Sequence, residues 1–110
     1  MDLDNETKEK IQELQSYEQN LQNLLMQKQT FQIELSESEN ALSEISKSDE
    51  DVYKIVGQVM IKVKKDIIIK ELNQKIDLLN LRLKSIEKQE SELTKDFEEL
   101  RKEVLKKINK

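Results

Sequence analysis

The segment VYKIVGQVMIKV, residues 52–63, is dense in β-branched residues and carries the chain's one glycine, Gly57, near its midpoint. Two runs of about five such residues on either side of a turn residue are typical of a pair of short strands. Glycine at the first central position of a two-residue turn is what a type II′ hairpin requires. The segment therefore predicts a β-hairpin, with Val56 opposite Val59 across the turn.

Long heptad patterns lie on both sides of this hairpin. Alternate steps of three and four residues from Leu14 to Ile45 land on apolar side chains at eight of ten positions, and Lys28 and Ser38 are the exceptions. The same stepping from Ile69 to Lys107 gives ten apolar positions of twelve. These two series of positions are called the seams below. Runs of this length are long for a globular helix and typical of a coiled coil.

The sequence predicts a single domain over residues 1–110 with three elements: a helix over residues 4–46, the hairpin over residues 52–63 and a helix over residues 66–108. Proline is absent, so little interrupts either helix, and a run of Ser and Asp favours an end to the first helix near Ser46. With Gly57 as the pivot, the two seams face each other. The expected fold is therefore mainly α, a long antiparallel two-helix coiled coil with one β-hairpin between the helices.

Each seam contains one charged residue that could meet the other across the helix pair. Lys28 and Glu90 lie one layer apart in the expected register, which is near enough for an ion pair. Polar residues at such positions can specify the register of a coiled coil. The alternative is that each long side chain reaches water separately.

Composition excludes most catalytic chemistry. The chain has no Cys and no His, so disulfides, the common zinc sites and histidine acid–base catalysis are excluded. We expect no enzyme activity, no catalytic residue, no cofactor and no metal. The first residues are acidic and form no apolar run, so we expect no signal peptide. No apolar run is long enough for a membrane span, so a cytoplasmic protein without membrane contact is expected.

Charge divides the chain into an acidic and a basic half. Residues 1–51 hold 13 acidic residues and 4 Lys, a net of −9, whereas residues 52–110 hold 10 acidic and 15 basic residues, a net of +5. Opposite halves suit an antiparallel helix pair. The basic clusters lack stacking aromatic side chains, so no nucleic-acid partner is expected.

The predicted hairpin is expected to need a partner chain. Two strands alone are marginally stable in water, and both of their edges are unpaired. We expect hairpins from several subunits to join in an intersubunit β-barrel or sheet. The residues predicted to be buried between subunits are Val52, Ile55, Val56, Val59, Ile61 and Val63. The alternative is a hairpin that folds back on its own helices.

The hairpin sequence, together with Tyr17, Gln27, Gln29 and the stretch LNLRL at residues 79–83, resembles the prefoldin family and in particular its archaeal β-type subunits. Members of the α-type carry two hairpins between their helices. Here only 19 residues, 47–65, separate the helices, which is room for one hairpin. Once the family is granted, this spacing favours the β-type.

The resemblance implies a hexameric, ATP-independent molecular chaperone. Its partners would be two α-type subunits and four β-type copies, with hairpins forming a β-barrel platform. Such a complex captures unfolded proteins at coiled-coil tips and delivers them to a group II chaperonin. The alternative is a structural or tethering coiled-coil protein that oligomerises through its hairpin.

The client-binding site is predicted at the end of the helix pair that holds the termini. The first seam weakens before Leu14, where Lys10 and Thr7 come next, while the second helix remains apolar. Apolar side chains there would be exposed and mobile, as a binder of varied unfolded chains requires. The predicted client-binding residues are Leu3, Ile11, Leu25, Met26, Val104, Leu105 and Ile108. The alternative is that these are frayed ends without a role.

Overall fold

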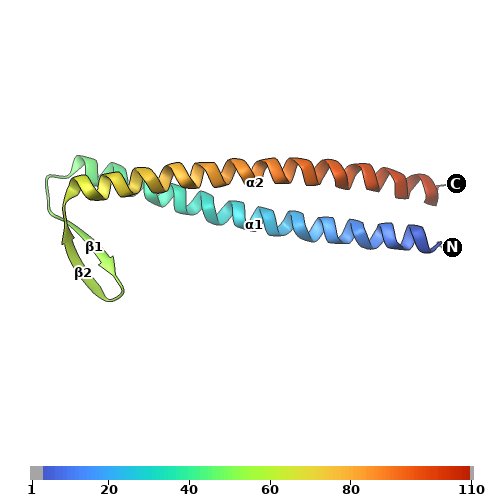
Figure 1. Ribbon diagram of the computed structural model, residues 1–110, viewed down its shortest axis with the longest axis horizontal. Helices are drawn as coiled ribbons and strands as arrows, with labels where there is room; N and C mark the ends of the chain where they lie inside the picture. Colours follow the sequence, from blue (N-terminus) through green and yellow to red (C-terminus); the bar gives the residue numbers. More distant parts are fainter. Residues whose placement is uncertain (1–3, 110) are drawn as a thin grey trace. The chain divides into compact units, whose positions relative to one another are not determined.

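The computed structural model describes residues 4–109 of the chain. Along the chain, a two-stranded antiparallel sheet comes between two helices, in the order α1, β1, β2, α2 (Figure 1). Their bounds are Asn5–Lys47 for α1, Val52–Val56 for β1, Val59–Val63 for β2 and Lys65–Ile108 for α2. The predicted fold class of two long helices with one hairpin between them is confirmed, and each helix end lies within one residue of its expected position.

The hairpin has the expected register and turn. Val56 pairs with Val59, and the ladder continues to Val52 opposite Val63. Gly57 has a φ of 61°, whereas Gln58, like every other non-glycine residue among 4–109, has a negative φ. A positive angle followed by a negative one matches type II′ and excludes type I′. Glycine therefore occupies the one position in the turn where a side chain would be strained.

Side-chain hydrogen bonds lie at both ends of α1. The Thr7 backbone N–H donates to the Asp4 carboxylate over 2.7 Å, which satisfies one of the unpaired donors at the start of α1. After α1, the Ser48 carbonyl accepts a hydrogen bond of 2.6 Å from the Lys65 ammonium group, and the Ser48 hydroxyl accepts one of 3.0 Å from the Glu50 N–H. The polar run that follows Ile45 thus ends the helix by offering alternative hydrogen bonds.

The chain forms two compact units, and both helices run through both of them. Unit 2, residues 30–83, contains the hairpin and the adjoining parts of α1 and α2. Its helix pair buries Leu79 and Leu83, and the Arg82 guanidinium lies 5.7 Å from the centre of the Phe31 ring. In the same unit, the Lys54 ammonium of β1 lies 3.4 Å from a Glu71 carboxylate oxygen of α2.

Unit 1 consists of residues 1–29 and 84–110. Ion pairs between α1 and α2 join its two segments, and Ile86, Val104 and Thr7 are buried in it. In each unit, every apolar seam position from Leu14 to Ile45 and from Ile69 to Val104 is buried or half-buried. The seams predicted from the heptad pattern are therefore the contact faces of the helices.

Candidate functional site

The hairpin exposes apolar side chains on both faces. Val56, Val59 and Ile61 lie on one face and are each about half exposed. Ile55, on the other face, is 72% exposed, and Tyr53 and Met60 beside it are also exposed. Within unit 2, the hairpin does not fold back on its helices, and the alternative of a self-covered hairpin is wrong.

The six hairpin residues predicted to lie between subunits differ in exposure within the single chain. Val52 and Val63, at the ends of the ladder, are half-buried, and Ile55, Val56, Val59 and Ile61 are exposed. An apolar sheet that is exposed on both faces is typical of a surface that binds another protein chain. Their burial between subunits stays a prediction.

The helix ends that carry the termini are paired rather than frayed. Val104 is 4% exposed and Thr7 is 2% exposed, so both belong to the buried seam of unit 1. The expectation that Val104 is an exposed, mobile side chain is wrong. Thr7 is a polar member of this seam: its N–H donates to the Asp4 carboxylate over 2.7 Å, and among the described residues no buried polar side-chain atom lacks a hydrogen-bond partner.

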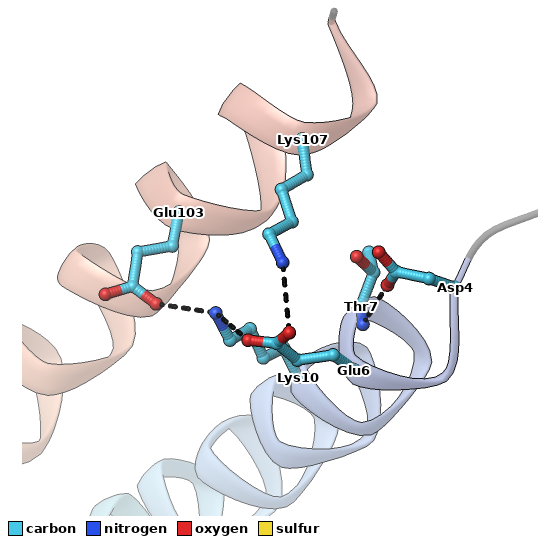
Figure 2. Close-up of polar contacts among 6 residues, drawn as sticks. All are labelled: Asp4, Glu6, Thr7, Lys10, Glu103 and Lys107. Atoms are coloured by element: carbon cyan, nitrogen blue, oxygen red, sulfur yellow. Dashed lines mark hydrogen bonds and ion pairs between the residues drawn. The ribbon is translucent and has the colours of Figure 1, made fainter.

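Charged side chains cross between the helices at this end (Figure 2). The Lys10 ammonium lies 3.3 Å from a Glu103 oxygen and 3.5 Å from Glu6, and Lys107 lies 3.4 Å from the other Glu6 oxygen. The hydrogen bond to Glu103 raises the pKa of Lys10, with Glu6 adding to the shift. These four residues are called the end clamp below.

The remaining predicted client-binding residues fall into two groups. Leu25, Met26 and Leu105 are exposed, and Ile11 and Ile108 are half-buried. Leu3 lies outside the described residues. In the heptad, Ile11, Leu25 and Ile108 are e positions, each directly after a d position of a seam, and Leu105 is the b position directly after Val104. In an antiparallel helix pair the e positions of both helices, with the neighbouring b positions, lie on the same flank. This set, Ile11, Leu25, Leu105 and Ile108, is called the apolar flank.

The Lys28–Glu90 pair predicted from the seam interruptions is confirmed. The Lys28 ammonium lies 3.2 Å from a Glu90 carboxylate oxygen, and the two side chains are 26% and 23% exposed. The alternative, in which the two side chains reach water separately, is wrong. The pair joins α1 to α2 between apolar layers of the seam.

The flank opposite the apolar one holds a groove that the sequence interpretation missed. Its volume is about 470 Å³. The lining residues are Asn20, Asn23, Leu24, Gln27, Gln89, Glu92, Leu93 and Asp96. The signal was present in the sequence, because three carboxamide residues, Asn20, Gln27 and Gln89, stand beside the seams where coiled coils usually carry Glu and Lys. This feature is called the amide groove.

Two further structural expectations concern metals and membranes. Within the described range, His, Cys, Asp and Glu side chains form no group of three or more that could hold a metal ion. Neither α1 nor α2 has, over residues 4–109, a stretch long and apolar enough to cross a membrane.

Comparison with known proteins gives a consistent result. A family model described as Prefoldin subunit matches residues 8–110. The Prefoldin subunit beta of Thermococcus kodakarensis is 43% identical over 90 residues, which cover 80% of this chain and 77% of that protein. The Prefoldin subunit beta of Methanothrix thermoacetophila is 36% identical over 101 residues, which cover 90% of this chain and 84% of that protein.

Solved structures agree. The crystal structure of the prefoldin beta subunit from Thermococcus strain KS-1 superposes with a TM-score of 0.85 at 37% identity, covering 94% of this chain and 92% of that one. The beta2 subunit from the same strain gives a TM-score of 0.71 at 18% identity, which shows the shared fold alone. The resemblance to β-type subunits inferred from the hairpin sequence is therefore confirmed.

Proposed function

The chain belongs to the prefoldin family, and from this premise we propose that it is a β-type subunit of an ATP-independent chaperone that captures unfolded proteins. We propose further that the assembly contains two α-type and four β-type subunits. It works in the cytoplasm, without catalysis or a cofactor, and delivers its clients to a group II chaperonin.

The observation that carries the proposal is the two-sided apolar hairpin. A two-stranded sheet with Ile55 and Met60 on one exposed face and Val56, Val59 and Ile61 on the other would be poorly stable and prone to aggregation alone. Pairing with hairpins of other subunits covers both faces and both edges at once. We propose that the hairpins close into a barrel, because closure leaves no strand edge unpaired.

Client capture is assigned to the apolar flank. Leu25 and Leu105 are exposed there, and Ile11 and Ile108 extend the surface at its margin. Met26, which is 65% exposed, adds an adaptable side chain next to Leu25. Leu3 stays a predicted contact beyond the described residues. Val104 is not included, because it is buried in the seam.

Assembly is tested by co-expressing the chain with an archaeal α-type prefoldin subunit and measuring the mass of the complex by native mass spectrometry. We expect a hexamer of two α-type and four β-type chains. A chain that stays monomeric with every α-type partner tried contradicts the proposed assembly.

Client capture is tested on the intact complex by its suppression of aggregation of a chemically denatured protein. Leu25→Ser with Leu105→Ser should reduce the suppression, because apolar contact area is lost. The matched control is Ile33→Ser with Leu81→Ser, which removes exposed apolar side chains of unit 2 outside the apolar flank. A wild-type complex that assembles but never suppresses aggregation would favour the structural or tethering alternative.

A further inference from the structure

The amide groove is hollow because its side chains do not bridge the helices. Asn20 and Gln27 of α1 and Gln89 and Asp96 of α2 stand beside the seam, where long charged pairs usually close over it. No ion pair in the described part of the chain joins residues 20–27 to residues 89–96 on this flank; the nearby Lys28–Glu90 pair occupies the seam itself. The groove therefore stays open above Leu24 and Leu93.

The hydrogen-bonding groups of the groove are largely unused within the protein. Gln89 donates one hydrogen bond, to the Ser85 hydroxyl over 3.2 Å, and retains its carbonyl oxygen and a second N–H. Among residues 4–109, the side chains of Asn20, Asn23 and Gln27 make no hydrogen bond to another residue. A carboxamide offers both donors and an acceptor, so these four can match either kind of polar group.

An extended peptide main chain presents the complementary pattern. Its N–H and C=O groups recur along both edges in every sequence, so side chains that both donate and accept can bind it without reading its side chains. The carboxylates of Glu92 and Asp96 supply further acceptors for peptide N–H groups and for basic client side chains. The eight residues from Asn20 to Gln27 span roughly 10 Å of helix, the length of about three extended residues.

We propose that the amide groove binds the main chain of an extended segment of an unfolded client. This inference rests on the proposed function and deepens it, because it gives the chaperone a second contact that is independent of client sequence. The apolar flank selects exposed hydrophobic side chains, and the amide groove, on the opposite flank of the same unit, selects polypeptide that is not yet in helix or sheet.

The first test compares two pairs of substitutions in the assembled complex. Asn20→Ala with Asn23→Ala removes two groove carboxamides, and the matched control, Gln19→Ala with Gln22→Ala, removes two from the same turns of α1 outside the groove. Affinity is measured for fluorescently labelled, reduced and carboxymethylated α-lactalbumin, with circular dichroism to check helix content. We expect the groove variant to bind about fivefold more weakly, equivalent to one net hydrogen bond, and the control to match wild type.

The second test asks whether the main chain is what is recognised. A nine-residue synthetic peptide is compared with the same peptide N-methylated at its three central residues, while the Asn20, Asn23 and Gln27 side-chain amide signals are followed by NMR. We expect shifts with the first peptide and none with the methylated one.

Equal binding of both peptides, or equal binding of α-lactalbumin by the groove and control variants, overturns the groove proposal alone. A wild-type complex that binds no unfolded protein overturns the proposed function and the groove together.

Discussion

Thr7 shows how a polar residue can extend an apolar seam. Its side chain is 2% exposed, and its backbone N–H donates to the Asp4 carboxylate at the start of α1 over 2.7 Å. The same two residues therefore form the helix cap and close the end of the seam. The hydrogen bonds from Thr7 lower the pKa of Asp4 below its usual 3.8.

This lowered pKa predicts an acid-sensitive helix start. Since the folded-state pKa lies below 3.8, the cap stabilises α1 fully above that value and loses its effect as pH falls through the folded pKa. We expect NMR helicity of residues 5–8 to fall over this acid range in wild type. Asp4→Asn can still cap but does not titrate, so its helicity should stay level there; an identical acid transition in this variant would show that another group is responsible.

The end clamp predicts that opposite charges help to hold α1 against α2 at the end that carries the termini. Lys10→Glu places like charges opposite Glu103 and Glu6, so the helix ends should separate and Val104 should lose protection. Native-state hydrogen exchange should show faster exchange of the Val104 amide. The swap Lys10→Glu with Glu103→Lys restores an opposite-charge pair across the helices and should recover most of the protection. Unchanged exchange in the single variant would mean that the apolar seam alone holds the ends.

At the scale of the elements, α1 and α2 owe their register to both the apolar seams and the Lys28–Glu90 pair. The ion pair has a distance of 3.2 Å, and both side chains are about a quarter exposed. A one-heptad slip would retain apolar contact at most layers but would separate these two charges. The pair therefore adds specificity that apolar side chains alone do not provide.

A double-mutant cycle with Lys28→Met and Glu90→Gln measures this contribution. Thermal unfolding of the assembled complex should give a coupling free energy of about 0.5–1 kcal/mol, because both groups remain partly solvated. The coupling should decrease at high salt. Strictly additive single effects would show that the pair contributes nothing to stability beyond the packing of its side-chain stems.

At the scale of the whole molecule, the hairpin is the element that the single chain leaves uncovered. The apolar seam positions of unit 1 are buried or half-buried, whereas the strands of unit 2 expose Ile55, Val59 and Ile61. The helices therefore contact each other within the chain, whereas these apolar side chains of the sheet stay exposed in the described part of the chain. Assembly should depend on the hairpin and leave helix content unchanged.

Val59→Lys with Ile61→Lys tests this separation. Charged side chains on the hairpin face cannot be buried without a counter-charge, so the variant should release monomers that keep their far-ultraviolet helix signal. The matched control, Leu78→Lys with Leu81→Lys, places the same charges on exposed apolar positions of α2 outside the hairpin and should assemble normally. Normal assembly of the hairpin variant, measured by native mass, would remove the hairpin as the interface.

Most of the fold could be predicted from the sequence because its signals are local. Three-and-four spacing from Leu14 to Ile45 specifies which face of a helix is buried, and Gly57 specifies where two strands turn. The same periodicity brought Lys28 within reach of Glu90 once the turn defined the register. These inferences needed only neighbouring residues and a single pivot.

The functional surfaces depended on the tertiary structure. Thr7 weakens the seam when judged by residue type, but the structure buries both Thr7 and Val104, with the Asp4 cap and the cross-helix pair between Lys10 and Glu103 at the same end of unit 1. The amide groove likewise exists only because the fold brings residues 20–27 of α1 opposite residues 89–96 of α2. Local periodicity determines which side chains point inward. Satisfied hydrogen bonds, cross-helix charges and open volume depend on partners far apart in sequence, so they appear only when both helices are in place.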